Sequence, residues 1–240
     1  MVIGWGVIGC SSMADERTIP AIRETENSKL VAVMSRSFKK AEASAAKHGA
    51  ERYYDTLDTL LKDDEVDAVY ISTPTYLHAS QTIQAAEAGK HVLCEKPMGL
   101  NMEECLRMVE ACKKASVKLM IGHHMRFKPD NIKIQKMIAN GDVGDVTLAR
   151  AQLSIWYQPD PTVWRMNLSL GGGGSLMDLG VHCIDLLRFL IQSEVAEVGA
   201  YINIVAFDYP VEDTAVVLMR FKNNACGIVD SCFNTRYSEG

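Results

Sequence analysis

Apolar runs alternate with helix-forming stretches through the first half of the chain. The runs that predict strands are Trp5–Ile8, Lys29–Met34, Asp67–Thr73, His91–Cys94 and Lys118–Gly122. Three stretches between them predict helices, which end near Ile22, Ala88 and Ala115. Strands and helices that alternate at this spacing predict a parallel sheet wrapped on both sides, the doubly wound Rossmann class of α/β fold.

The pattern changes near Phe127. A helix is predicted over Asn131–Ala139, and four long runs of alternating polarity follow: Thr147–Gln158, Val195–Phe207, Ala215–Lys222 and Gly227–Thr235. Strand runs after an alternating half predict a second domain of α+β class with a mostly antiparallel sheet. We place the domains at residues 1–124 and 125–240. Because no helix pattern follows the last run, we expect the second domain to be truncated at its C-terminus.

The composition is ordinary for a soluble globular protein, with 48% apolar and 23% charged residues among 240. The net charge of -5 offers no basic face for nucleic acid, and no apolar run reaches the roughly 18 residues of a membrane span. The chain opens directly on a strand pattern without a signal peptide, so we expect a cytoplasmic protein. The seven cysteines include no Cys-x-x-Cys pair, which favours reduced thiols and no metal.

The first predicted strand runs into the loop Gly9-Cys10-Ser11-Ser12-Met13-Ala14. The order of strand, loop and helix and the approximate G-x-G-x-x-A spacing are typical of a dinucleotide-binding turn, in which N–H groups at the helix start bind the pyrophosphate. Ser11 stands in the place of the middle glycine, where its hydroxyl can donate a hydrogen bond to the pyrophosphate instead. The alternative is an ordinary tight turn.

The second predicted strand ends in Ser35-Arg36-Ser37, about where a Rossmann fold places its ribose-recognising residue. No acid is present to accept hydrogen bonds from the 2′-hydroxyl of NAD. A guanidinium between two hydroxyls, with Lys40 one helical turn further on, suits a 2′-phosphate. The loop therefore predicts NADP, with NAD as second choice, and the alternative is a solvated basic loop.

A third loop, formed by Glu95, Lys96 and Pro97, follows the strand His91–Cys94. Open α/β sheets place their ligands at the carboxyl ends of strands, and Pro97 keeps Lys96 extended at this end. The position makes Lys96 a candidate for chemistry, and the alternative is a solvated lysine. His78, in the first turn of a predicted helix, is either a cofactor contact or a capping or surface residue.

A glycine-rich segment over residues 171–185 carries a second candidate cluster. Ser175 can cap a helix that runs to about Ile191, and Asp178 and His182, four residues apart, then share one helix face. In the alternative interpretations Asp178 completes a capping box with Ser175, and His182 is a satisfied histidine between packed elements. Metal hydrolysis through this pair is disfavoured, because further ligands at recognisable spacing are missing.

Five ordered blocks of the chain together resemble the Gfo/Idh/MocA family of oxidoreductases. The blocks are Gly6-x-x-Gly9, Thr73-Pro74 with His78, Gly89-Lys90-His91-Val92-x-x-Glu95-Lys96-Pro97, Trp164-Arg165, and Gly173-Gly174-Ser175-Leu176-x-Asp178-x-Gly180-x-His182-x-x-Asp185. The loop at Arg36 and the segment His123-His124-Met125-Arg126 look most like the branch that includes 1,5-anhydrofructose reductase.

The resemblance implies a Rossmann domain for NADP or NAD, an open-faced sheet that forms the interface of a homo-oligomer, and an active site between the two domains. It implies hydride transfer between nicotinamide and a carbonyl or secondary alcohol of a sugar, polyol or related cyclic compound. The implied catalytic residues are Lys96, Asp178 and His182, with His182 as the proton donor or acceptor. The implied cofactor-binding residues are Gly9, Cys10, Ser11, Ser12, Met13, Ser35, Arg36, Lys40, Thr73, Pro74, Leu77, His78, Glu95, Lys96, Arg126, Trp164 and Arg165.

Two features depart from the family pattern. Ser11 replaces the middle glycine of the loop, and the chain stops short of most members. The alternative from another class is a nucleotide-binding sensor or scaffold that keeps the fold and has lost the reaction. The presence of Lys96, Asp178 and His182 together favours the enzyme.

Overall fold

The computed structural model describes residues 2–160 and 162–236. The chain divides into two compact units, Met1–Gly122 and His123–Gly240, and the predicted domain boundary falls two residues after this division. No helix within the described ranges is long and apolar enough to cross a membrane.

The first unit is built on a six-stranded sheet in the order β3-β2-β1-β4-β5-β6, with all neighbouring strands parallel. The strands are β1 (Ile3–Ile8), β2 (Ser28–Met34), β3 (Arg52–Tyr54), β4 (Ala68–Ile71), β5 (His91–Cys94) and β6 (Leu119–Ile121). The helices and helical turns are η1 (Ala14–Thr18), α1 (Ile19–Glu24), α2 (Phe38–His48), α3 (Leu57–Leu61), η2 (Thr75–Leu77), α4 (His78–Glu87) and α5 (Met102–Lys114). The predicted Rossmann sheet is confirmed, and α2, β3 and α3 are elements that the hydrophobic pattern did not predict.

Side chains along β4 show why both faces of this sheet are covered. Val69 and Ile71 point to one face, where they pack with Leu60 of α3 and Met108 of α5. Tyr70, between them, points to the other face and packs with residues of α1 and α2. Every residue of β4 is buried, as expected for a central parallel strand, whose two faces both lie under helices.

The second unit holds a four-stranded sheet in the order β7-β10-β9-β8. Its strands are β7 (Leu148–Ser154), β8 (Val195–Asn203), β9 (Thr214–Phe221) and β10 (Cys226–Cys232). The pairings of β9 with β8 and β10 are antiparallel, while β10 and β7 are parallel. The predicted mostly antiparallel sheet is therefore confirmed, with one parallel pairing. The helices and helical turns of this unit are η3 (His124–Phe127), α6 (Pro129–Ala139), η4 (Trp164–Met166), α7 (Leu168–Gly171), η5 (Leu176–Gly180) and α8 (Val181–Ile191).

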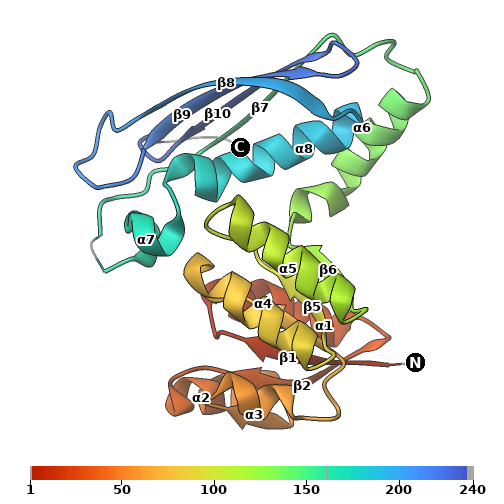
Figure 1. Cartoon of the computed structure of the whole chain (residues 1–240), viewed down its shortest axis with the longest axis vertical. Coiled ribbons are helices and arrows are strands. Elements are labelled where there is room, and N and C mark those ends of the chain that lie inside the picture. Colours follow the sequence, from red (N-terminus) through yellow and green to blue (C-terminus); the bar gives the residue numbers. More distant parts are fainter. Residues whose placement is uncertain (1, 161, 237–240) are drawn as a thin grey trace. The chain divides into compact units, whose positions relative to one another are not determined.

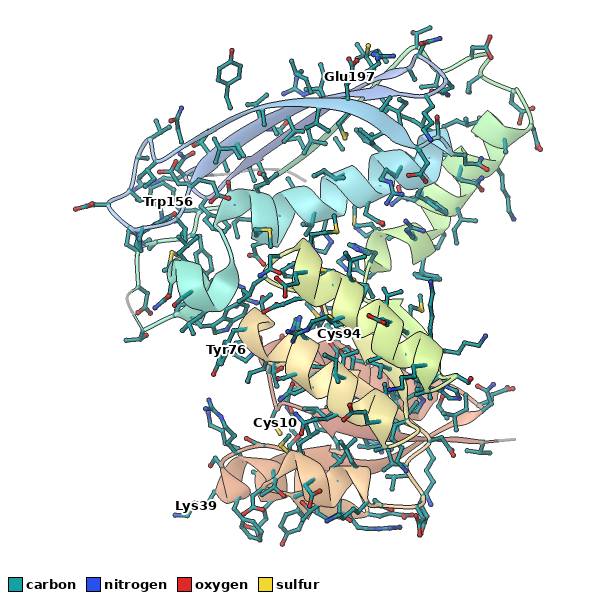
Figure 2. All side chains as sticks on the ribbon, viewed as in Figure 1. Cys10, Lys39, Tyr76, Cys94, Trp156 and Glu197 are labelled. Atoms are coloured by element: carbon teal, nitrogen blue, oxygen red, sulfur yellow. The ribbon has the colours of Figure 1, made fainter. Side chains whose placement is uncertain are left out.

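Helix α8 covers one face of this sheet (Figure 1). Leu187 and Ile191 of α8 pack with Val217, Met219 and Phe221 of β9 in a buried cluster. The other face is open, and its apolar side chains are exposed: Tyr201 by 79% and Leu218 by 52%. Glu197, labelled in Figure 2, lies on this open face, where it pairs with Arg220 of β9.

Candidate active site

The loop after β1 is shaped to approach a phosphate group. Gly9 has a φ of +97°, and a Cβ atom there would lie 3.0 Å from Thr73 Cγ2 and 3.1 Å from the Ser72 carbonyl oxygen, so only glycine fits. A helix begins directly afterwards, and the N–H groups of Ser12 and Met13 at its start have no intrahelical acceptor. Such N–H groups bind anions. The loop lies between β1 and β4, where the strand order reverses, and it fits the pyrophosphate of a dinucleotide.

The Ser11 hydroxyl is hydrogen-bonded within the protein. Ser72 Oγ donates to the Gly9 carbonyl oxygen at 2.9 Å, so the hydrogen between the Ser11 and Ser72 hydroxyls, which are 2.9 Å apart, belongs to Ser11. Ser11 Oγ also accepts the Ala14 N–H at 3.1 Å. Its one hydrogen is thus used within the protein in this arrangement, and donation from Ser11 to a pyrophosphate stays a prediction. The residue ties the loop to the end of β4.

The basic loop after β2 lies next to the loop after β1. Arg36 and Lys40 are exposed, with Ser35 half-buried at the end of the strand. Burial raises the pKa of the Cys10 thiol, and the positive charge of Lys40 lowers it in part. The influence of Lys40 on Cys10 shows that these two loops are neighbours. In a dinucleotide the ribose follows the pyrophosphate, and the loop after β2 follows the loop after β1 in the same way.

Glu95 and Lys96 follow β5 at the same edge of the sheet. Tyr70 Oη donates to Glu95 Oε1 at 2.7 Å, and the Lys96 backbone N–H donates to Glu95 Oε2 at 3.3 Å. Burial raises the pKa of Tyr70, and the negative charge of Glu95 raises it further. The hydroxyl therefore stays protonated and remains a donor. Lys96 itself is half-buried, beside the carboxylate that the tyrosine holds.

His78 is neither a surface residue nor a cap. Its ring is 1% exposed, with Nδ1 2.8 Å from the Pro97 carbonyl oxygen and Nε2 2.9 Å from the Thr73 carbonyl oxygen. Both ring nitrogens are thus directed at backbone carbonyl oxygens, and the predicted cofactor contact of this side chain stays a prediction. His78 instead connects the turn that holds Thr73, Pro74 and Leu77 with the turn that holds Lys96.

Glu212, which comes shortly before β9, holds the glycine-rich segment in front of η5. Its carboxylate accepts the Gly174 N–H at 2.7 Å and the Leu176 N–H at 2.9 Å, and its carbonyl accepts the Ser175 N–H at 2.9 Å. A Cβ atom at Gly174 would lie 1.9 Å from that carbonyl oxygen. The predicted cap from Ser175 is wrong, because its buried hydroxyl donates to the Ser231 carbonyl oxygen at 3.1 Å. The alternative interpretation of a capping box between Ser175 and Asp178 is therefore wrong as well.

Asp178 lies in the helical turn η5, and His182 lies in helix α8, which follows it directly. Arg165 Nε lies 3.4 Å from Asp178 Oδ1, and the Arg165 guanidinium lies over the Trp164 ring at 4.5 Å from its centroid. His182 is buried on the same helix. The structure therefore joins three predicted residues, Trp164, Arg165 and Asp178, in one set of contacts. Their predicted roles toward nicotinamide and substrate stay predictions.

Arg126 has a partner within the second unit. Its Nε and Nη2 atoms donate to the two carboxylate oxygens of Asp185 at 2.7 and 2.6 Å, and the guanidinium lies over the Phe189 ring. The bidentate pair raises the pKa of Arg126. The side chain is therefore engaged in fixing η3 to α8, and its predicted contact with the cofactor stays a prediction.

Metal ligands do not gather at this site. The described ranges contain no group of three or more histidine, cysteine, aspartate and glutamate side chains placed to hold a metal ion.

Comparisons with known proteins agree with this geometry. Residues 3–123 match the family described as "Oxidoreductase family, NAD-binding Rossmann fold", and residues 132–240 match the Gfo/Idh/MocA C-terminal domain. The 1,5-anhydro-D-fructose reductase of Ensifer adhaerens is 35% identical over 98% of this chain and 71% of its own length. The chain belongs to the Gfo/Idh/MocA family.

Solved structures of this family superimpose closely on the chain. The aldose-aldose oxidoreductase of Caulobacter crescentus, in complex with glycerol, has a TM-score of 0.93 and 34% identity, over 98% of this chain and 72% of that one. Levoglucosan dehydrogenase in complex with NADH has a TM-score of 0.91 and 27% identity, over 99% of this chain and 68% of that one. The chain spans 59–73% of the length of its curated Gfo/Idh/MocA relatives.

One residue of the site, Glu212, carries no signal in the sequence. Glu212 lies 36 positions from the Leu176 N–H that it accepts, and no motif connects the two. His124 belongs to a segment that was noted only as part of the resemblance, yet its ring meets that of His182.

Proposed function

We propose that the protein is an NADP(H)-dependent oxidoreductase that transfers a hydride between nicotinamide and a carbonyl or secondary alcohol of a sugar, polyol or related cyclic compound. The observation that carries the proposal is the pair of built sites. One is the Gly9 loop with Lys96 at the carboxyl edge of the parallel sheet, and the other is Asp178 with His182 on a helix start fixed by Glu212. Relatives named as sugar or polyol reductases and dehydrogenases support the substrate class.

The preference for NADP rests on the loop after β2. Arg36 and Lys40 are exposed and positively charged, residues 35–37 include no carboxylate, and Lys40 acts electrostatically on Cys10 in the pyrophosphate loop. A guanidinium gives charge-assisted hydrogen bonds to a phosphate. Two solved relatives are complexes with NAD or NADH, so the preference is a property that we assign to this chain and not to the family.

The chain's own residues handle the proton and the orientation of the substrate. Bound nicotinamide would supply or accept the hydride. We assign the proton transfer at the substrate oxygen to His182, since an imidazole is the side chain best suited to exchange protons near neutral pH. Asp178, held by Arg165, orients the substrate hydroxyl, and Lys96 polarises the substrate oxygen.

The deciding experiment is a screen of sugars, polyols and their oxidised forms with the full chain, followed by NADPH absorbance. Lys96→Ala and His182→Ala should each lower kcat by roughly a hundredfold or more, the size of a general acid–base contribution. NADPH affinity should change less than about tenfold, because neither residue contacts the adenosine half. His91→Ala, an exposed histidine at the opposite end of β5 from Lys96, is the control and should keep the parent values.

A parent protein that binds NADPH but turns over no carbonyl or alcohol would contradict the proposal and favour the sensor or scaffold. A His182→Ala variant that keeps the parent kcat and pH profile would contradict only the proton-transfer role of His182, and not the proposed activity.

A further inference from the structure

Two imidazole rings meet in the second unit. The ring centroids of His124 and His182 are 4.9 Å apart, with their planes at 68°. His124 opens η3, and His182 lies in the first turn of α8, which packs against η3. The two rings differ in their access to solvent: His182 is 6% exposed, whereas His124 is an exposed residue.

The elements that carry this pair, or pack against them, hold several charged groups. Arg126 of η3 binds both carboxylate oxygens of Asp185 on α8, and His123 Nδ1 lies 3.9 Å from the same carboxylate. Arg165 Nε lies 3.4 Å from Asp178 of η5. Helix α6 also packs against η3, and its charged residues Asp130, Lys133 and Lys136 are all exposed. The side chains in this region whose ordinary pKa lies near neutral are the imidazoles of His123, His124 and His182.

Two protonated imidazoles in contact repel each other strongly in a partly buried site. The first proton that the pair takes up therefore disfavours the second, and the two steps belong to the pair and not to either ring. A buried proton carrier also needs a path to solvent, because it must regain its starting protonation state in every turnover.

We propose that His124 is a proton-relay residue that acts through His182. In the reducing direction, the carbonyl carbon gains the hydride from the reduced cofactor, and the carbonyl oxygen gains the proton of His182. His124 then takes a proton from solvent and passes it to His182, and the oxidising direction runs in reverse. The inference rests on the proposed role of His182 and adds to it the route by which the buried ring exchanges its proton.

The test uses two substitutions of one residue. His124→Gln removes the titrating group, and His124→Phe keeps an aromatic ring against His182 without any nitrogen. His123→Gln is the matched control, since its ring lies near Asp185. Turnover is measured across pH in dilute buffer, with and without added free imidazole. The imidazole C–H signals of the cofactor-free chain are followed by NMR over the same pH range.

We expect both His124 variants to lose at least about tenfold in kcat in dilute buffer, and free imidazole to restore kcat in a concentration-dependent way. The His182 signal should titrate in two steps in the parent and in the His123→Gln control. In both His124 variants it should titrate in one step, with its midpoint roughly one pH unit or more higher, because the neighbouring positive charge is gone.

Three results would overturn the relay: a His124→Phe variant that matches the parent, a loss of turnover that free imidazole does not restore, or a single-step titration of His182 in the parent. The failure of the proposed function is distinguishable from these. If no substrate turns over, or if His182→Ala is fully active, the role assigned to His182 is wrong. The titration of the cofactor-free chain still decides whether the two rings share a proton.

Discussion

The carboxylate of Glu212 is expected to determine the stability of the helix that carries Asp178 and His182. We consider Glu212→Gln, which keeps the size of the side chain and removes its charge. The amide oxygen can still accept one of the two N–H groups, from Gly174 or Leu176. The amide NH₂ group must then face the other N–H, and two donors cannot pair.

The magnitude follows from these contacts. One lost hydrogen bond to a charged group costs about 1.5–3 kcal/mol. The loss of a negative charge at a helix N-terminus adds about 0.3–1 kcal/mol. We therefore expect the free energy of unfolding to fall by about 2–4 kcal/mol. Glu197→Gln removes an equal charge from the open face of the sheet, where Glu197 and Arg220 are exposed, and should change the free energy of unfolding much less, because exposed ion pairs contribute little.

Urea unfolding of the full chain, followed by far-UV circular dichroism, measures both changes. Hydrogen exchange then locates the effect: amides of η5 and α8 should exchange faster in Glu212→Gln, while those of β4 and β5 in the first unit keep the parent rates. The reasoning is refuted if Glu212→Gln unfolds within about 0.5 kcal/mol of Glu197→Gln, the usual range of surface substitutions, or if the exchange of α8 is unaltered.

Three further outcomes are expected. Arg36→Ala should weaken NADPH binding about thirtyfold, the equivalent of about 2 kcal/mol of charge-assisted hydrogen bonds, and leave NADH binding unchanged in calorimetric titrations; a parent that prefers NADH would contradict it. The open sheet face should pair two or more copies, so light scattering at micromolar concentration should show a dimer or larger that Leu218→Glu, at a site 52% exposed, dissociates; a monomeric parent speaks against it. For Asp213, burial raises the pKa, but N–H bonds from residues 205–207 outweigh it and hold the pKa below 3.8. The ionised Asp213 therefore stabilises the folded state above pH 3.8, and this stabilisation is lost as the pH falls through the folded pKa. Asp213→Asn should thus reduce the pH dependence of the unfolding free energy measured between about pH 5 and 2. Equal slopes in both proteins would refute this.

The Rossmann half was predictable because its signals are local. A buried parallel strand is an apolar run, and the loops that follow β1, β2 and β5 come directly after such runs, so Gly9, Arg36 and Lys96 could be placed at one edge of the sheet. The three-residue β3 was not predicted, because a run of that length shows no periodicity.

Contacts between distant segments were not predictable. The cap of the helix that carries His182 was sought in the residue before it, Ser175, because most caps are local. The actual cap, Glu212, lies in the loop between β8 and β9, and only the tertiary fold brings this loop to the start of the helix. His78 was assigned from its position in a first helical turn, which does not show that the turn is buried beneath two loops.

The ring of His78 limits how the two loops can be held at the same time. Burial lowers the pKa of His78 and so favours the neutral imidazole, although hydrogen bonds to Pro97 and Thr73 oppose this. A neutral ring has one N–H, yet each of its nitrogens faces a carbonyl oxygen. The Thr73 turn and the Pro97 turn thus compete for a single hydrogen. Whatever draws the Thr73 carbonyl away releases that hydrogen to the carbonyl of Pro97, the residue that follows Lys96, so the position of the Thr73 turn and the anchoring of the lysine loop are thermodynamically linked.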